Sequence, residues 1–361
     1  MTRRYSARHA LVLGKLYPLH VGHQALIRAA QTAAERVTVL VVGSATESIP
    51  VATRVGWVRE EHPQVRVVGA EDEHEIDYGS ESAWQHHVGL MQSLLAPHAA
   101  VDGPVDLVAS SDGYGEELAR RLGARWLCVD PGRQATPVSG TAIRADLAGH
   151  WWALPPAVRA TLVRRVVVTG AESTGTTTLA ADLAEALGTI WVPEFGRTWT
   201  ELRPGGIHAP WHPAEFDLVA ACQARDEDAA ARHTPVPVLV CDTDVLTTTV
   251  WHERYVGTPS PTVAALAAAR VPDLYLLTGD EIPFVDDGMR DGEAIRPWMQ
   301  GRFRQVLAGQ PAPWVELRGS REQRLAAAVE QVRALHASGS GLGPSLEEQQ
   351  RSRDAASSAA R

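Results

Sequence analysis

A lysine and two histidines follow a short apolar run near the start of the chain, in the segment HALVLGKLYPLHVGH at residues 9–23. If the apolar run is a buried strand, the glycine turn lies at its carboxyl end. The helix after the turn then offers free backbone N–H groups and the positive end of its dipole. An ammonium group and two imidazoles placed there suit the α-, β- and γ-phosphates of a nucleoside triphosphate. The residues of this first candidate site are Gly14, Lys15, His20, Gly22 and His23.

A second helix start rich in backbone amides is predicted in VSGTAIR, residues 138–144, directly after the turn-rich stretch DPGRQATP. Ser139 and Thr141 are residue types that cap helix N-termini, and Arg144 lies one turn inside the predicted helix. The guanidinium group of Arg144 can therefore bind a leaving pyrophosphate. Capping alone, with Arg144 on a solvated helix face, is the structural alternative.

A glycine-rich loop follows another apolar strand in VVVTGAESTGTTT, residues 166–178. It matches the P-loop pattern GxxxxGK[ST] except at Thr176, which occupies the lysine position. The backbone amides can still surround a phosphate, and Thr177 can still bind Mg²⁺, because neither role needs the ammonium group. A tight turn without a ligand is the alternative. The residues of this second candidate site are Gly170, Ser173, Thr174, Gly175, Thr176, Thr177 and Thr178.

Charged residues follow the next two predicted strands of the second half. Glu194 and Arg197, in VPEFGRTW, stand where nucleoside kinases place groups that bind or deprotonate the acceptor. Asp242 and Asp244, in LVCDTD, end the following strand. One carboxylate there can order Mg²⁺, and the other can take the proton of an acceptor hydroxyl. Capping of the following helix is the alternative role for both aspartates.

The segment FVDDGMRDGEAIR, residues 284–296, is rich in charge and glycine, which is typical of a mobile lid. Such a lid would bring Arg290 or Arg296 to the transferring phosphate. An arginine in that position would supply the positive charge that Thr176 cannot.

Short apolar runs alternate with helical patterns along the chain, which predicts an α/β fold with two doubly wound parallel sheets. The predicted strands cover residues 10–13, 37–42, 65–68, 105–109 and 126–129, and then 165–169, 190–192, 236–241, 274–277 and 314–317. The predicted helices cover residues 24–36, 81–95, 214–232, 261–269, 297–307 and 321–336. Because Pro155 and Pro156 mark a boundary, we expect domains at residues 1–160 and 161–338. The tail, residues 339–361, has almost no large apolar residue and is expected to be disordered.

The composition limits the classes of function. The 361 residues, 45% of them hydrophobic, suffice for two α/β domains. A net charge of -9 and a pI near 5.9 argue against a nucleic-acid-binding surface and favour small nucleotide ligands. The three cysteines lack metal-ligand spacing. Neither a signal peptide nor a run of about 18 apolar residues is present, so we expect a cytoplasmic protein without membrane contact. The oligomeric state, a homo-oligomer included, is left open.

Acceptor recognition is predicted between the two motifs of the first half. Trp84, in DYGSESAW, can stack on a flat cationic ring such as nicotinamide, and packing in the core is its alternative role. Arg54, after an apolar strand and turn, is a further candidate. So is the stretch SSDGYG at residues 110–115, at a strand end where ligands of such sheets bind.

The pair HVGH and SGTAIR resembles the HxGH and SxTxxR motifs of the nucleotidylyltransferases. Over residues 9 to about 335, the order of GKLYPLHVGH, DPGRQATPVSGTAIR, GAESTGTTT, PEFGR, CDTD and IPFVDDGMRD resembles the NadR family of bifunctional nicotinamide-nucleotide adenylyltransferases and ribosylnicotinamide kinases. The resemblance implies a Rossmann-like nucleotidylyltransferase domain followed by a P-loop nucleoside-kinase-like domain. It also implies that the first domain makes NAD⁺ from nicotinamide mononucleotide and ATP, and that the second phosphorylates nicotinamide riboside. Some members carry an amino-terminal helix-turn-helix domain, but only eight residues precede His9, so DNA binding is not expected here.

The chemistry expected at the first site is in-line attack of an acceptor phosphate oxygen on the α-phosphorus of ATP, with Mg²⁺ bound to the triphosphate. Thr176 departs from the family pattern and leaves a second hypothesis open, in which the P-loop half senses nucleotide without turnover. A third hypothesis is transfer to another small phosphate, such as phosphopantetheine or a sugar phosphate.

Overall fold

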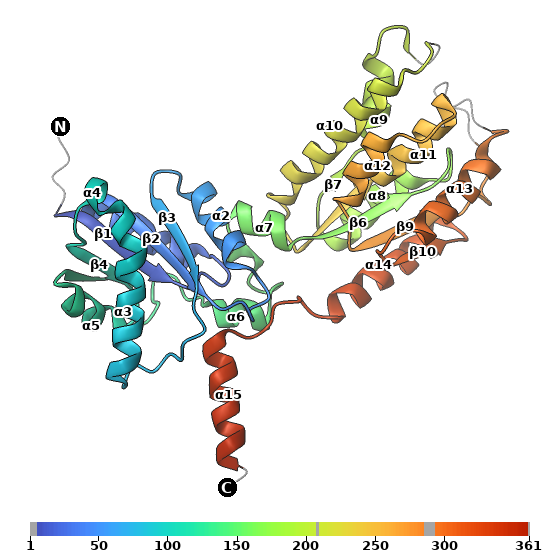
Figure 1. The fold of residues 1–361 in the computed structure, drawn as a ribbon. Helices are drawn as coiled ribbons and strands as arrows, with labels where there is room; N and C mark the ends of the chain where they lie inside the picture. Colours follow the sequence, from blue (N-terminus) through green and yellow to red (C-terminus); the bar gives the residue numbers. More distant parts are fainter. Residues whose placement is uncertain (1–5, 207–208, 285–292, 360–361) are drawn as a thin grey trace. The chain divides into compact units, whose positions relative to one another are not determined.

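The computed structural model describes residues 6–206, 209–284 and 293–359, and the chain divides into two compact units. The first unit comprises Met1–Val158 together with Ser340–Arg361, and the second comprises Arg159–Gly339. Each unit contains one five-stranded sheet whose neighbouring strands are all parallel (Figure 1). The predicted α/β fold with two parallel sheets is confirmed.

The strands of the first unit are β1 (Ala7–Gly14), β2 (Ala34–Gly43), β3 (Arg66–Glu71), β4 (Leu107–Ser110) and β5 (Arg125–Cys128). Its helices are α1 (Val21–Ala33), α2 (Val51–Glu61), α3 (Glu81–Leu95), η1 (Ala96–His98), α4 (Ala99–Asp102), α5 (Tyr114–Leu122), α6 (Gly140–Ala145), η2 (Trp151–Ala153) and α15 (Leu346–Ala359). Helix α7 (Pro156–Leu162) spans the residues at which the chain passes to the second unit.

The first sheet has the strand order β3-β2-β1-β4-β5, so β1 lies at its centre. Apolar residues on successive positions of β1 are fully buried, as expected of a central parallel strand with both faces covered. On one face, Leu11 packs with Trp84 of α3 and Leu118 of α5. The chain adds β2 and β3 on one side of β1 and then crosses to the other side for β4, and this reversal leaves a crevice at the carboxyl ends of β1 and β4.

The strands of the second unit are β6 (Arg164–Thr169), β7 (Trp191–Val192), β8 (Val238–Asp242), β9 (Leu274–Thr278) and β10 (Trp314–Leu317). Its helices are α8 (Thr176–Leu187), α9 (Phe195–Leu202), α10 (Pro213–Ala231), α11 (Val245–Val256), α12 (Pro261–Ala268), α13 (Arg296–Ala308) and α14 (Arg321–Ala337). Within the described residues, none of the helices of either unit is both long and apolar enough to cross a membrane.

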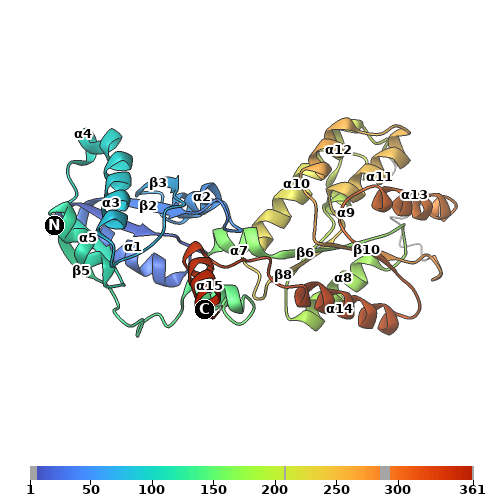
Figure 2. The same ribbon diagram turned by 60° about the horizontal axis from the view of Figure 1, so that its bottom comes forward.

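The second sheet has the order β10-β9-β6-β8-β7, with β6 at its centre. Val166 and Val168 of β6 pack with Leu183 of α8 and Val332 of α14 on one face. Helices α10, α11 and α12 lie on the other side of the sheet and share a separate apolar cluster around Phe216 (Figure 2). Because β6 and β8 are neighbouring parallel strands, their carboxyl ends both lie at the glycine-rich loop that follows β6.

Several segments differ from the sequence-based predictions, which named no helix at the positions of α2, α5 and α9. The helix expected at residues 24–36 ends at Ala33, because Ala34 begins β2. Helix α11 was expected only in the capping alternative for Asp242 and Asp244, without a range, since its run of threonines is β-branched and disfavours helix. The tail at residues 339–361 was expected to be disordered, but residues 346–359 form α15. Leu346 is buried in the first unit. This single apolar residue and the polar contacts described below hold the tail in place, although the tail has too few apolar residues to form a core of its own.

Candidate active sites

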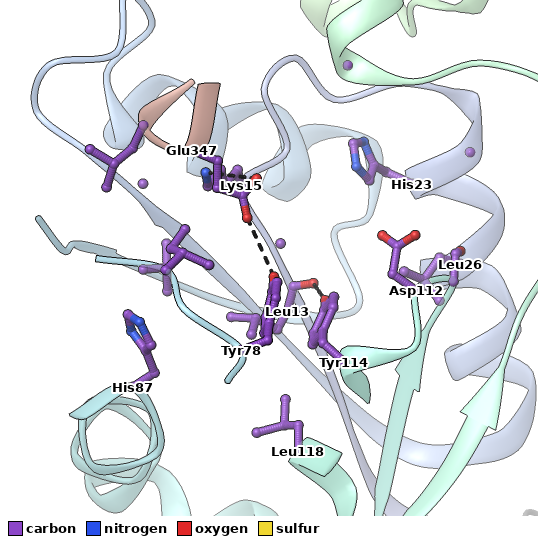
Figure 3. A pocket seen from close by; sticks show the side chains of 18 of the residues that line it. Leu13, Lys15, His23, Leu26, Tyr78, His87, Asp112, Tyr114, Leu118 and Glu347 are labelled. Carbon is purple, nitrogen blue, oxygen red and sulfur yellow. Dashed lines mark hydrogen bonds and ion pairs between the residues drawn. The ribbon is translucent and has the colours of Figure 1, made fainter. Parts of the chain in front are cut away.

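A cavity of about 300 Å³ opens at the carboxyl ends of β1, β2 and β4 in the first unit. Its walls include Lys15, His20 and His23 of the first motif and Gly140 of the second, so the fold brings both predicted motifs to one place. Figure 3 shows Lys15, His23, Tyr78 and Tyr114 around the cavity.

His20 is the N-cap of α1, where its Nδ1 accepts a hydrogen bond from the Gly22 N–H at 3.1 Å. Gly22 is required there, because a Cβ would lie 2.9 Å from the His20 ring. The rings of His20 and His23 are 3.8 Å apart between centroids. The Nδ1 atom of His23 is buried and has no hydrogen-bond partner among the described residues, which leaves it available to a ligand.

Both imidazoles are neutral at pH 7. Burial, helped by the charge of Arg133, lowers the pKa of His20 to about 4. Burial also lowers the pKa of His23 well below its ordinary value, and His20 and Arg133 add to the shift. The neutral imidazoles can therefore offer hydrogen bonds to an anionic ligand, but they cannot supply fixed positive charge.

These shifts predict how the stability of the first unit depends on pH. A histidine with a lower pKa in the folded chain binds protons preferentially when unfolded, so the unfolding free energy should fall as the pH drops from 6.5 toward 4. His20 alone should contribute on the order of 3 kcal/mol. The measurement is hydrogen exchange of β1 amides in urea across this pH range. His20→Asn keeps an N-cap side chain and should show a shallower decline, and an identical decline in the variant would contradict the assignment.

The second motif is held against the first by its glycine. A Cβ at Gly140 would lie 2.6 Å from the carbonyl oxygen of Tyr17, so α6 can start there only without a side chain. Ser139 caps α6 by accepting from the Ala142 N–H, as predicted. Arg144 donates from Nη1 to the Tyr17 carbonyl, which fixes its guanidinium beside the loop that carries Lys15.

The candidates for acceptor recognition have different positions. Trp84 is only 8% exposed, donates from Nε1 to the Tyr78 carbonyl and packs in the core, as its alternative role describes. It also lines the cavity, and its stacking on a ligand ring stays a prediction. Arg54 is fully buried, 2.7 Å from the carboxylate of Glu47, and donates to the Lys15 carbonyl. The prediction that Arg54 contacts the acceptor is therefore wrong. Its charge is paired with Glu47, and its hydrogen bond to the Lys15 carbonyl stabilises the loop that carries Lys15.

Several cavity residues were missed by sequence reasoning. Tyr78 and Tyr114 line the cavity with their rings stacked at 5.9 Å between centroids, and both lie in segments named as candidates without being singled out. Arg133 also lines the cavity and has a positive φ of 55°. The turn sequence DPGR, in which an arginine follows a glycine just before the second motif, was the signal that could have identified Arg133.

The glycine-rich loop of the second unit connects β6 to α8 in the manner of a P-loop. Gly175 has a φ of 85° and Ser173 a φ of 58°, so the loop curls back before the helix. A Cβ at Gly170 would lie 2.2 Å from the Thr278 hydroxyl, which explains the glycine at the end of β6. A second cavity of about 110 Å³ lies beside this loop, with Gly170, Ser173, Thr176 and Thr177 in its wall.

Thr177 and Asp242 lie together as predicted for a magnesium site. The Thr177 hydroxyl donates to Asp242 Oδ2 at 2.6 Å, and Asp242 Oδ1 is buried with no hydrogen-bond partner in the described part of the chain. Burial raises the pKa of Asp242 to about 6, although the Thr177 hydrogen bond opposes the shift. A buried carboxylate oxygen without a donor, next to a hydroxyl, is a donor set that suits Mg²⁺.

Two arginines hold the loop from its carbonyl side. Arg296 donates to the Ser173 carbonyl at 3.2 Å, and Arg324 donates to the Thr174 carbonyl at 2.8 Å. Arg296 was predicted to approach the phosphate in place of a lysine; it contacts the loop through the Ser173 carbonyl but does not line the second cavity, so its approach to the phosphate stays a prediction. Arg290 lies outside the described residues, so its predicted role stays a prediction.

Not every loop residue faces the second cavity. Thr174 is buried and donates to the Ala171 carbonyl, while Thr178 is exposed on α8. Neither side chain lines the cavity, so the prediction of phosphate contact through them is not supported at the side-chain level. Their backbone amides still belong to the loop.

On the acceptor side, Glu194 and Arg197 line the second cavity as expected. Asp244 does not line it: its side chain caps α11 through the Thr247 N–H and accepts from Tyr275 at 2.6 Å. The predicted catalytic or substrate role of Asp244 is therefore wrong, and the capping alternative describes it.

An aromatic wall in the second cavity was not predicted. It consists of Trp211, Phe216, Trp251 and Tyr255. The ring centroids of Trp211 and Tyr255 are 5.3 Å apart and those of Trp251 and Tyr255 are 6.2 Å apart, both in stacked arrangements. Such a wall suits a flat, cationic ring. The available signal was the concentration of aromatic residues at 211–255 in a chain with only 6% aromatics.

A family model described as an AAA domain matches residues 165–324. The curated proteins named trifunctional NAD biosynthesis/regulator protein NadR from Salmonella typhimurium (strain LT2) and Escherichia coli (strain K12) are each 27% identical over 294 residues, 78% of this chain and 71% of theirs. A solved NadR structure in complex with NR has a TM-score of 0.70 at 20% identity, covering 92% of this chain and 98% of that one. A NadR structure with NAD and AMP-PNP has a TM-score of 0.69 at 19% identity, covering 91% and 97%. The chain shares its fold with these proteins.

Proposed function

We propose that this chain, a relative of the NadR proteins, joins nicotinamide mononucleotide to the adenylyl group of ATP in its first unit and phosphorylates nicotinamide riboside in its second. The observation that carries the proposal is the convergence of Lys15, His20 and His23 with the Gly140 helix start on one cavity at the reversal of strand order. The relatives named for NAD biosynthesis support the choice of acceptor.

In the first unit, a phosphate oxygen of the mononucleotide attacks the α-phosphorus of ATP. The new P–O bond forms as the bond to the β-phosphate breaks, and pyrophosphate leaves. The neutral imidazoles of His20 and His23 offer hydrogen bonds to the phosphate oxygens, while Lys15 and Arg144 balance the charge that develops on pyrophosphate. Thr141 lies at the same helix start. No protein nucleophile is needed.

In the second unit, the loop amides and Thr177 bind the ATP phosphates, and Asp242 with Thr177 would hold Mg²⁺. When bound, the metal would neutralise negative charge on the β- and γ-phosphate oxygens. Glu194 accepts the proton of the riboside hydroxyl as that oxygen attacks the γ-phosphorus and ADP leaves. Arg197 and the aromatic wall orient the riboside, with the rings against its cationic nicotinamide.

Thr176 reduces the charge available to the transferring phosphate, so we expect the kinase to be slow. Thr176→Lys should raise the rate of riboside phosphorylation by about tenfold or more, with a smaller effect on ATP affinity, because the ammonium acts on charge that develops in the transition state. ADP release measures the rate, and calorimetry the affinity. Thr178→Lys is the matched control, since it places the same charge on the exposed face of α8.

If the wild-type protein binds no nucleotide in its second unit and Thr176→Lys restores neither binding nor turnover, the kinase assignment fails. Nucleotide binding without turnover in both proteins would favour the alternative of a nucleotide-sensing unit, which the threonine at the lysine position motivates.

The direct test of function is a product assay on the full chain with nicotinamide riboside, nicotinamide mononucleotide and ATP, read by chromatography. NAD⁺ and pyrophosphate from the mononucleotide, and mononucleotide and ADP from the riboside, are the expected products. Phosphopantetheine and sugar phosphates serve as competing acceptors. Adenylyl transfer to one of these in preference to the mononucleotide would overturn the choice of acceptor.

A further inference from the structure

The carboxyl-terminal segment lies at the mouth of the first cavity. Leu346 and Glu347 form part of the cavity wall. The segment is anchored by backbone contacts, because the Tyr17 hydroxyl donates to the Gly343 carbonyl at 2.9 Å and the Leu346 N–H donates to Glu47 at 3.1 Å. Helix α15 begins beside α6 (Figure 1). Tyr17 and Glu47 thus form part of a docking site for the segment, in which Leu346 is buried.

Two adjacent carboxylates of this segment contact the anion-binding groups of both motifs. Glu347 Oε2 lies 3.5 Å from Lys15 Nζ, and Figure 3 shows the two side chains together at the cavity with Tyr78. Glu348 Oε1 accepts from Arg144 Nη2 at 2.6 Å and from the Thr141 hydroxyl at 2.7 Å. A carboxylate oxygen in such a place makes the hydrogen bonds that a phosphate oxygen would make.

Glu348 and a phosphate group would compete for Arg144. Its guanidinium donates from Nη1 to the Tyr17 carbonyl and from Nη2 to Glu348 and Thr141, so a phosphate oxygen can replace the Nη2 contact with Glu348 only when Glu348 leaves. Glu348 remains charged at neutral pH: burial would raise its pKa, but hydrogen bonds from Arg144, the Ser345 N–H and Thr141 outweigh it and lower the pKa to about 2.

The chain leading into the segment permits it to leave. Gly341 has a φ of 71°, a conformation that favours glycine, and Gly343 follows in the sequence GSGLGPS. Helix α15 carries mostly polar residues, and Leu346 is its only large apolar one. Undocking of the segment therefore exposes little apolar surface.

We propose that residues 343–350 are an internal competitor of ATP, in which Glu347 and Glu348 occupy the positions of triphosphate oxygens at Lys15, Thr141 and Arg144. The proposal rests on the proposed adenylyltransferase function of the first unit. ATP binding and segment docking are then linked reciprocally, and the fraction of chains with the segment undocked sets the apparent affinity for ATP.

The test compares the full chain with Glu347→Gln/Glu348→Gln, which keeps the side-chain shapes and removes both charges. The variant should lower the KM for ATP in NAD⁺ formation by about three- to tenfold with little change in kcat, because each partly exposed ion pair is modest in strength. Asp354→Asn is the matched control, since it removes a charge from the exposed face of α15 and should leave KM unchanged. An unchanged KM in the double variant would overturn the proposal.

A second measurement does not depend on activity. Hydrogen exchange of the amides at residues 345–350 should be slow in the free protein and should accelerate when ATP alone is added to saturation. Exchange that ATP leaves unaltered would also overturn the proposal. If instead the protein forms no NAD⁺ under any condition, the proposed function fails, while the exchange experiment still reports whether ATP displaces the segment.

Discussion

His23→Ala should lower the rate of NAD⁺ formation by about two to three powers of ten, because it removes a hydrogen-bonding group held in place where charge develops on the phosphates. The imidazole is neutral and buried, and its Nδ1 has no protein partner among the described residues, so its loss leaves the phosphate without a preorganised contact. Steady-state assays with the mononucleotide and ATP measure the effect. A rate within threefold of the wild type would remove His23 from the mechanism.

The matched control is His62→Ala. His62 is also a buried histidine of the first unit with a pKa lowered by burial, but it does not line the cavity. A loss of activity caused only by removing a buried imidazole would appear in both variants. Phosphorylation of the riboside by the same molecules provides an internal check on folding of the second unit.

Asp242→Asn should lower riboside phosphorylation by about two to three powers of ten and weaken the dependence of nucleotide binding on Mg²⁺. The amide oxygen can still accept the Thr177 hydroxyl, so the hydrogen bond and the strand end are retained while the anionic charge is lost. Titration of Mg²⁺ against ADP release and against nucleotide binding separates the two effects.

Asp280→Asn is the control for this variant, since Asp280 follows β9, another strand of the same sheet, without lining the second cavity. NAD⁺ formation should be unchanged in both proteins. If Asp242→Asn keeps full kinase activity and an unchanged Mg²⁺ requirement, the carboxylate does not hold the metal.

The sheets and the loops that line both cavities were predictable because they depend on local signals. Apolar runs of three to six residues identified the strands, and glycine with lysine, histidine or threonine after a strand identified the two loops. The positions of His23 and Thr177 follow directly from those strands. The α/β alternation then fixed the cavity at the strand ends.

The remaining site residues depend on contacts that spacing does not reveal. Arg54 and Arg144 are the same residue type, but Arg54 is buried against Glu47 while Arg144 lies on a helix start beside the cavity. Asp242 and Asp244 are separated by Thr243, whose φ of 67° turns the chain, so one carboxylate faces the glycine-rich loop and the other enters the core. The docking site of the tail likewise depends on contacts with Glu47 and Tyr17, which are far from the tail in sequence.

The first unit is built from both ends of the chain, with the second unit inserted between them in sequence. A cut at the boundary near residue 158 therefore does not yield two intact halves. A fragment ending there would carry every residue of the HxGH and SxTxxR motifs but would lose Leu346, Glu347 and Glu348 from around Lys15, Thr141 and Arg144. Kinetic constants measured on such a fragment would describe a site with a different charge. Tags fused after α15 would act on the first unit, although the second unit directly precedes the tail in the sequence.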